Sequence, residues 1–222
     1  MTEQLDRRAD ATRLQILRAA SHQFAYKPYS LVSLDDILAD AEVTKGAMYF
    51  HFRSKHALAS AIVEHRTAAA RHAVDQLLAR RLSGLETLID ILYLVATQDI
   101  GDETARAGFN LLESIGRTDG LQSSVLGEWV TAFGQILRKG TKEGDIADGA
   151  DPDGIARLLV AMYMGLRQTS DLTSPDQFFR DLEIMWSLLL PGFVKHDRID
   201  YLIQFIKRRT AVAIKKATPL VP

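Results

Sequence analysis

A short run of residues in the N-terminal quarter of the chain carries side chains that are well suited to binding DNA. Thr44 and Lys45 open the run, Gly46 follows them, and Tyr49 comes one helical turn later. A hydroxyl, an ammonium group and a phenol can contact base edges and phosphates, and a glycine lets the backbone approach the duplex. Because threonine is a preferred helix cap, the run predicts a short helix from Lys45 to about Phe50.

The segment before this run predicts a supporting helix and a tight turn. Ser33 followed by Asp36 is a capping box, which places a helix start near Leu34. Apolar residues at helical spacing then predict one buried face, formed by Leu34, Ile37, Leu38 and Ala41. Residues 41–43 suffice for a sharp turn, and residues 12–26 predict another helix. The three predicted helices together have the layout of a small domain with a DNA-binding helix-turn-helix motif.

The sequence V-T-K-G-A-M-Y-F-H-F-x-S-K-x-x-L at residues 43–58 resembles the N-terminal signature of the TetR family of one-component transcriptional regulators. The resemblance implies three residues that enter the major groove of DNA, which are Thr44, Lys45 and Gly46. It also implies four contacts to backbone phosphates, made by Ser33, Tyr49, His51 and Lys55. The contact by Ser33 would use the amides at a helix terminus, where an anion is favoured.

The aromatic residues of this stretch have a second interpretation as the core of a small three-helix domain. We expect Phe50 and Phe52 in the core, whereas Tyr49 and Lys45 are expected to contact DNA. One departure from the family lies in the loop between the first two helices, where a glycine is usual. This chain has Y-K-P-Y-S at residues 26–30, and its proline is expected to stiffen the loop.

Bulk composition is that of an ordinary globular protein and does not by itself indicate nucleic acid. The chain has 222 residues, of which 47% are hydrophobic and 25% charged, and it contains no cysteine. It has no long uncharged apolar run and no apolar signal region, so we expect a cytoplasmic protein without a membrane segment. Residues 1–58 hold 8 basic and 7 acidic side chains, so the argument for DNA depends on placement rather than on net charge.

The remainder of the chain predicts further helices and no strand. Ser54 can cap a long helix that runs to about Arg80. Helical patterns follow at about residues 84–98, 103–117, 122–142, 152–170, 175–194 and 198–216. The sequence thus predicts an all-α protein with two domains. Residues 1–58 would form the helix-turn-helix DNA-binding domain, and residues 59–222 a helical domain for ligand binding and dimerisation.

An aromatic face in the second domain suggests a small-molecule pocket, although spacing alone favours an ordinary helical core. Glu128-Trp129, together with Met185-Trp186 further on, resembles the γ-butyrolactone receptor branch of the family. That resemblance implies that Trp129 packs on a signal molecule. Other wall residues are equally well explained as core: Tyr93, Phe109, Leu112, Phe133 and Met162. Arg66 and Leu166 depart from the branch, which usually has glutamine and threonine there, so the ligand can be other than a butyrolactone.

Two consecutive late helices carry apolar stripes that could pair with a second copy of the chain. One stripe consists of Ile155, Leu158, Leu159, Met162 and Leu166, and the other of Phe178, Leu182, Met185, Leu188 and Leu189. Two such hairpins can form a four-helix interface. A single helix-turn-helix contacts few base pairs, so we expect a homodimer on a palindromic operator. The basic segment 195–216 is expected to be a solvated helix end rather than a surface for membrane or DNA.

The function that joins these observations is a repressor that a small apolar or lactone-like effector releases from its operator. An enzyme is a weaker alternative, since no catalytic constellation and no nucleotide motif occurs and no cofactor is implied. A metal site is disfavoured because His65 and His72 share a helix face without an obvious third ligand. A helical carrier for an apolar metabolite would leave the T-K-G-x-x-Y helix unexplained.

Overall fold

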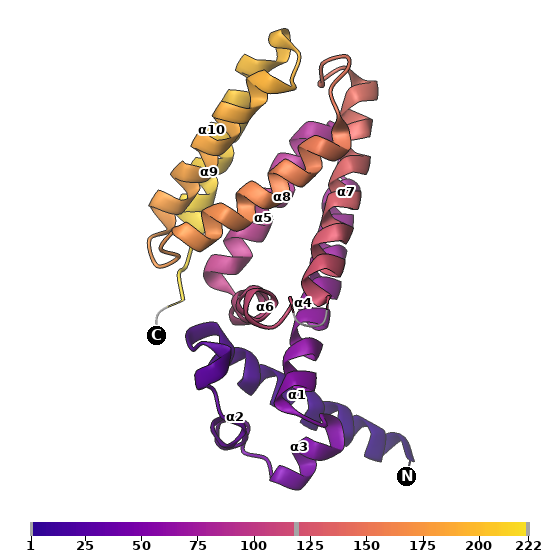
Figure 1. Ribbon diagram of the computed structural model, residues 1–222, viewed down its shortest axis with the longest axis vertical. Coiled ribbons are helices and arrows are strands. Elements are labelled where there is room, and N and C mark those ends of the chain that lie inside the picture. The colour runs from indigo at the N-terminus through magenta and orange to yellow at the C-terminus, as the bar shows by residue number, and fades with distance from the viewer. Residues whose placement is uncertain (1, 118–119, 221–222) are drawn as a thin grey trace. The chain divides into compact units, whose positions relative to one another are not determined.

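The computed structural model describes residues 2–117 and 120–220, and this part of the chain forms ten α-helices and two short 3-10 turns (Figure 1). The helices are α1 (Thr2–Tyr26), α2 (Leu34–Ala41), α3 (Lys45–His51), α4 (Lys55–Leu78), α5 (Gly84–Gly101), α6 (Glu103–Ser114), α7 (Leu121–Glu143), α8 (Pro152–Thr169), α9 (Pro175–Leu189) and α10 (His196–Lys216); the turns are η1 (Tyr29–Leu31) and η2 (Leu190–Gly192). Extended pairing in the described residues is one isolated bridge, between Ile146 and Val194. The prediction of an all-α fold is confirmed. Among the described helices, none is both long enough and apolar enough to span a membrane.

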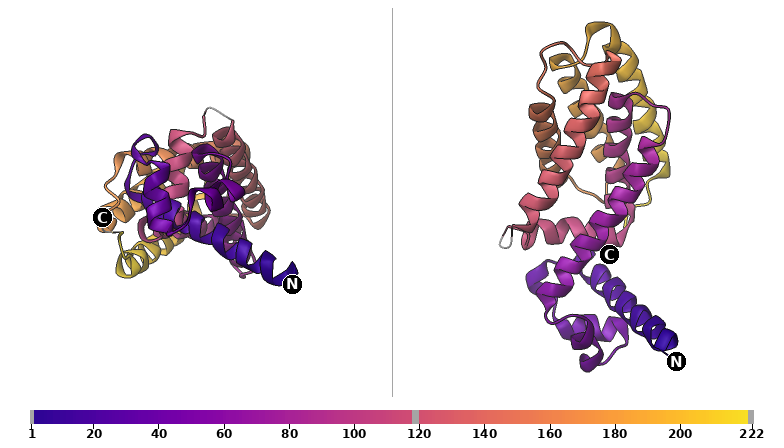
Figure 2. Two further views of the ribbon diagram at one scale, coloured as in Figure 1. Left: turned by 90° about the horizontal axis from the view of Figure 1, so that it is seen from below. Right: turned by 90° about the vertical axis from the view of Figure 1, so that its right-hand side faces the viewer.

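The chain packs into two compact units. The first holds residues 2–69, 102–117 and 120–123, and the second holds residues 70–101 and 124–220. Helix α6 belongs to the first unit because it packs on α1, although it follows α5 of the second unit in the sequence (Figure 2). The assignment of DNA binding to residues 1–58, and of ligand binding and dimerisation to residues 59–222, stays a proposal.

The core of the first unit comes from the predicted apolar faces. Ile16, Ala20 and Phe24 of α1 are completely buried, and so are Ile37 of α2 and Met48 of α3. Ile16, Ala20 and Phe24 follow one another at intervals of four residues, so a single side of α1 loses contact with water. The end of α1 at Tyr26 also agrees with the predicted break at Lys27-Pro28, because proline disfavours helical backbone in the residue before it.

The core of the second unit is aromatic and contains a buried ion pair. Trp186, Phe178 and Phe179 of α9 are completely buried. Arg167 of α8 donates from Nε to Oδ2 of Asp99 on α5 at 2.7 Å, and both side chains are almost fully excluded from solvent. Two further pairs hold α10, from Arg209 to Asp90 and from Arg198 to Asp145.

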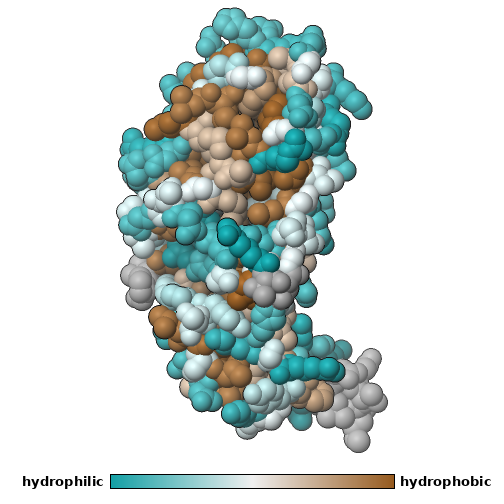
Figure 3. Space-filling view, viewed as in Figure 1, coloured by the Kyte–Doolittle hydropathy of each residue, from teal (hydrophilic) through white to brown (hydrophobic). Residues whose placement is uncertain are grey.

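The apolar stripes expected to form the dimer interface are only partly at the surface. On α9, Phe178, Leu182 and Met185 are buried within the unit, whereas Leu188 is 74% exposed. The prediction of an α9 interface stripe was therefore wrong for its first three members, because they face the protein's own core. The apolar surface consists instead of Leu158, Ile184 and Leu188, and Figure 3 shows brown surface over the upper part of the face on which α8 and α9 lie.

Candidate nucleic-acid interface and effector site

The helix-turn-helix is fixed by side-chain caps at the start of both of its helices. Ser33 Oγ accepts a hydrogen bond from the amide of Asp36 at 3.0 Å, and the Ser33 amide donates to Oδ2 of Asp36 at 3.0 Å. The Ser33 hydroxyl also donates to the Asp36 carboxylate, and this bond, together with the one from the Ser33 amide, holds the pKa of the Asp36 carboxyl below its usual value. Thr44 Oγ1 accepts from the amide of Ala47 at 3.2 Å, which sets the start of α3. The predicted capping box and the predicted cap at Thr44 are confirmed.

Between the two helices the chain reverses at a single strained position. Glu42 has a φ of 51°, in the left-handed region that residues other than glycine rarely adopt. Its amide lies at hydrogen-bonding distance from the carbonyl groups at the end of α2, so the residue closes that helix. This turn changes the direction of the chain between α2 and α3. In a helix-turn-helix motif the second helix, here α3, is the recognition helix.

The outward face of the recognition helix carries the residues that the sequence singled out. Thr44, Lys45 and Gly46 are exposed, and Tyr49 is 45% exposed, while Met48 anchors the helix in the core. A Cβ atom on Gly46 would meet only the Oγ1 of Thr44, at 3.9 Å, within the protein. The fold therefore does not require glycine at this position, whereas close approach to a DNA duplex would.

Phe50 lies on the same outward face and is 79% exposed, so its predicted place in the core was wrong. The reason is helical geometry. Met48 and Phe52 are four residues apart and point inward together, which turns Phe50 about 200° away from Met48. Phe52 is 4% exposed, which confirms its predicted place in the core. The ring of Phe50 meets that of His51 edge to face, with 5.0 Å between the ring centroids.

The two remaining predicted phosphate contacts, Ser33 and Lys55, both have partners inside the protein. The Ser33 hydroxyl also donates to Asp36 Oδ2 at 2.7 Å. Lys55 donates from Nζ to the carbonyl oxygens of Tyr29 and Val32, each at 2.8 Å. Lys55 thereby holds the loop between α1 and α2, in which this chain lacks the glycine that is usual in the family. Pro28 of this loop has a φ of −54° and directly precedes η1.

The residues predicted to bind an effector fall in both units. Phe109 and Leu112 are buried on α6 in the first unit, and the guanidinium of Arg66 lies over the Phe109 ring, 5.8 Å from its centroid. Four others belong to the second unit: Tyr93 on α5, Trp129 and Phe133 on α7, and Met162 on α8. Trp129 and Met162 are half-buried, and Phe133 is buried. Their roles in ligand binding stay predictions.

Tyr93 has an internal role that the sequence did not reveal. Its hydroxyl lies 2.6 Å from Oγ1 of Thr210 on α10, and its ring stacks on Phe179 at 6.0 Å between centroids. Burial raises the pKa of Tyr93 well above its ordinary value. Trp186, which the sequence singled out only as part of a motif, is fully buried, and its Nε1 has no hydrogen-bond acceptor in the described residues. A buried indole N–H usually has a partner, so Trp186 is a candidate polar contact for a bound molecule.

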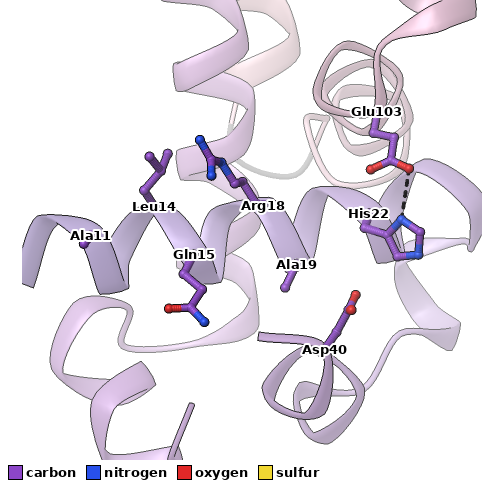
Figure 4. A pocket seen from close by; sticks show the side chains of 8 residues that line it. All are labelled: Ala11, Leu14, Gln15, Arg18, Ala19, His22, Asp40 and Glu103. Atoms are coloured by element: carbon purple, nitrogen blue, oxygen red, sulfur yellow. Dashed lines mark hydrogen bonds and ion pairs between the residues drawn. The ribbon is translucent and has the colours of Figure 1, made fainter. Parts of the chain in front are cut away.

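A shallow hollow of about 540 Å³ lies in the first unit, along α1 (Figure 4). His22 and Gln15 contribute from α1, Asp40 from α2 and Glu103 from α6. His22 Nδ1 lies 3.0 Å from Glu103 Oε1, and the Tyr26 hydroxyl donates to the same oxygen at 3.1 Å. These contacts tie α6 to α1. Across the described residues, no group of three histidine, aspartate or glutamate side chains is placed to hold a metal ion.

The chain is similar to known bacterial regulators along most of its length. Residues 16–62 match the model of the bacterial regulatory proteins of the tetR family. The A-factor receptor protein of Streptomyces griseus is 31% identical over 83% of this chain, and the match spans 64% of that receptor, just under two thirds of its length. The HTH-type transcriptional repressor DhaR of Mycobacterium sp. (strain GP1) is 27% identical over 81% of this chain and 93% of its own.

Solved structures share the fold as well. CprB of Streptomyces coelicolor, in complex with its biological operator sequence, is 29% identical and superposes with a TM-score of 0.77 over 92% of this chain and 99% of CprB. A gamma-butyrolactone receptor described as ArpA-like is 28% identical, with a TM-score of 0.74 over 92% of this chain and 98% of its own. The helix-turn-helix geometry and these similarities together show that the chain belongs to the TetR family of bacterial regulatory proteins.

Proposed function

We propose that this protein is a sequence-specific DNA-binding transcriptional regulator that acts in the cytoplasm as a repressor and is released from its operator by a small molecule. The observation that carries the proposal is the outward face of α3, where Lys45 and Tyr49 are exposed and where the fold does not require the glycine at position 46. Such a face, on a helix held by a tight turn, suits the major groove. The proposed function requires no catalysis.

The protein would act as a homodimer. Leu158, Ile184 and Leu188 are between 48% and 74% exposed, and they give α8 and α9 an apolar surface. Large exposed apolar areas on soluble proteins mark interaction sites, and the paired helices of two copies can form an isologous four-helix interface. Substituting Leu188 with glutamate should convert the dimer to a monomer, which light scattering would show. A protein that remains dimeric would remove this interface.

The effector would be a small, largely apolar or lactone-like molecule. The proteins to which the chain is similar include the A-factor receptor protein and gamma-butyrolactone receptors, as those proteins are named. In this chain, Trp129 offers a half-buried aromatic face, and Trp186 offers a buried N–H that could donate to a carbonyl oxygen of the ligand. For release to occur, the effector must bind the DNA-free form more tightly than the DNA-bound form.

The first test is direct. The purified protein would select fragments from genomic DNA, and fluorescence anisotropy would compare the best fragment with a scrambled duplex over a salt series. We expect a palindrome that binds at least about a thousandfold more tightly than the scrambled duplex, as specific regulators do. Equal and weak binding to both duplexes would overturn the proposed function.

A matched pair of variants separates DNA binding from effector binding. Lys45→Ala should lose operator affinity while its fold and its effector affinity remain those of the wild type. Trp129→Ala should retain operator affinity but need a higher concentration of a γ-butyrolactone probe for release. If Trp129→Ala and the wild type respond to the same probe concentration, Trp129 is not part of the effector site.

A further inference from the structure

A cation–π contact brings an arginine of the first helix to the end of the recognition helix. The guanidinium carbon of Arg13, on α1, lies 5.2 Å from the centroid of the Phe52 ring. Phe52 directly follows α3, and its amide donates to the carbonyl oxygen of Met48 at 2.8 Å. Because Phe52 is nearly buried, the ring is a fixed platform, and it fixes the position of the arginine head group.

The position of Arg13 on α1 explains why its guanidinium lies beside the Phe52 ring at the surface of the protein. Ile16 and Leu17 are buried one turn further along the same face of α1. Arg13 therefore lies where the buried face of the helix ends, and its aliphatic stem can cover apolar surface while the guanidinium reaches solvent. Figure 1 shows the N-terminal half of α1 extending past α3, away from α2.

Among the described side chains, no acidic group forms an ion pair with Arg13, Arg53 or Lys45. Arg13 is exposed, and in the part of the chain that the structure describes no carboxylate forms an ion pair with it. Arg53, next to Phe52, and Lys45, at the start of α3, are exposed and equally without an acidic partner there. Asp10, one turn from Arg13 on α1, is exposed and forms no ion pair with it. A guanidinium whose five donors lack a carboxylate is well suited to bind a phosphate group.

We propose that Arg13 binds a backbone phosphate of the operator, so that α1 adds a contact beside those of the recognition helix. This inference rests on the proposed function and extends it to a residue outside the helix-turn-helix. Arg13 reaches the duplex from the platform of Phe52, next to His51 and Arg53. Its contact is independent of base sequence, because a phosphate is common to all nucleotides.

The test measures operator affinity over a salt series for Arg13→Gln, with Arg18→Gln as the control. Arg18 is an exposed arginine on the same helix, five residues further along and therefore about 140° around the helix axis. Loss of one phosphate contact should reduce the slope of log affinity against log salt by about 0.9. The ratio of wild-type to Arg13→Gln affinity should then fall about 3.5-fold between 50 and 200 mM salt, whereas Arg18→Gln should follow the wild type.

Further variants exclude a merely structural effect of Arg13. Arg13→Lys keeps the charge and should restore most of the salt slope, and the melting temperature of each variant shows whether folding has changed. An unchanged slope for Arg13→Gln, or an equal reduction for Arg18→Gln, would overturn the inference while leaving the proposed function intact, provided that Lys45→Ala still abolishes specific binding. A wild-type protein that does not distinguish operator from scrambled DNA would overturn both.

Discussion

Lys55 holds Tyr29 through both its backbone and its ring, since its ammonium donates to the Tyr29 carbonyl oxygen at 2.8 Å and lies 4.1 Å from the ring centroid. The Tyr29 ring in turn stacks on the buried Phe24 of α1, 5.7 Å between centroids. A lysine that the family signature assigns to DNA thus has a second role in this protein. It joins the start of α4 to the loop between α1 and α2.

Replacing Lys55 with methionine should therefore destabilise the protein. The variant loses two hydrogen bonds from a charged donor and a cation–π contact, for which we expect about 2 kcal/mol. Urea unfolding followed by circular dichroism would measure the loss. Lys45→Met is the matched control, because Lys45 is exposed on α3 and should change stability by less than about 0.5 kcal/mol. Equal stability of the two variants would contradict the structural role of Lys55.

Gly46→Ala should stabilise the fold and weaken operator binding. The new methyl group would have only Thr44 Oγ1 nearby, at 3.9 Å, and alanine favours a helix over glycine by about 0.5 to 1 kcal/mol. On DNA, the same methyl group would block close approach of the backbone. Thermal unfolding and anisotropy on the selected operator would show the two opposite effects. A variant that binds the operator like the wild type would show that Gly46 does not face the duplex closely.

Phe50 and Phe52 should respond to alanine substitution in opposite ways. Phe50 is largely exposed, so Phe50→Ala should change the free energy of unfolding by no more than about 0.5 kcal/mol. Phe52→Ala should cost about 3 to 5 kcal/mol, because it empties part of a core. We also expect Phe50→Ala to lower operator affinity with an unchanged salt slope, since a neutral ring releases no counterions. A large loss of stability in Phe50→Ala would place that ring in the core after all.

The ion pair between Asp99 and Arg167 should be costly to break on one side only. Both side chains are buried, so Asp99→Asn leaves a buried guanidinium without its countercharge, for which we expect a loss of about 3 to 5 kcal/mol. The double variant Asp99→Leu with Arg167→Met removes both charges and should recover most of that loss. Chemical denaturation of the three proteins would test this. A double variant less stable than Asp99→Asn would show that the pair contributes more than the charges themselves.

Tyr93 should make the protein sensitive to alkaline pH. Burial raises the pKa of Tyr93 in the folded state, while an unfolded tyrosine ionises near pH 10. Below pH 10 the phenol is neutral in both states and its contribution to stability is complete. Above about pH 10 the unfolded chain ionises first, so stability falls as pH rises.

Tyr93→Phe isolates this effect. At neutral pH the variant should lose about 1 kcal/mol, because the hydroxyl of Thr210 loses its partner. Above pH 10 it should lose stability less steeply than the wild type. Tyr26 and Tyr201, whose pKa values are also raised, remain in both proteins and set the common background. Parallel stability curves for the two proteins above pH 10 would rule out the assigned role of Tyr93.

The sequence was sufficient where the determining interactions are local. The capping box of Ser33 and Asp36, the Thr44 cap and the break at Lys27-Pro28 each involve groups within three residues of one another, so residue type and spacing predicted them. Helical periodicity gave the all-α fold for the same reason. The family signature, a continuous segment, led to the recognition helix.

Other features depend on which helix faces which, and only the tertiary structure decided them. Phe50 has the side chain of a core residue, but Met48 and Phe52 occupy the inner side of the chain there, which leaves Phe50 outside. Phe178, Leu182 and Met185 are buried in their own unit rather than at the predicted interface, because α9 packs on both α8 and α10.

The partners of Lys55 and Arg13 lie farther along the chain than any local rule can reach. Lys55 and Tyr29 are 26 residues apart, and Arg13 and Phe52 are 39 apart. A charged side chain in a sequence gives its chemistry but not its neighbour, because the neighbour is supplied by packing. The sequence by itself therefore determined the position of most helices, the caps at Ser33 and Thr44 and the resemblance to the family. The tertiary structure decided that Lys55 is engaged within the protein and that Arg13 lies against Phe52.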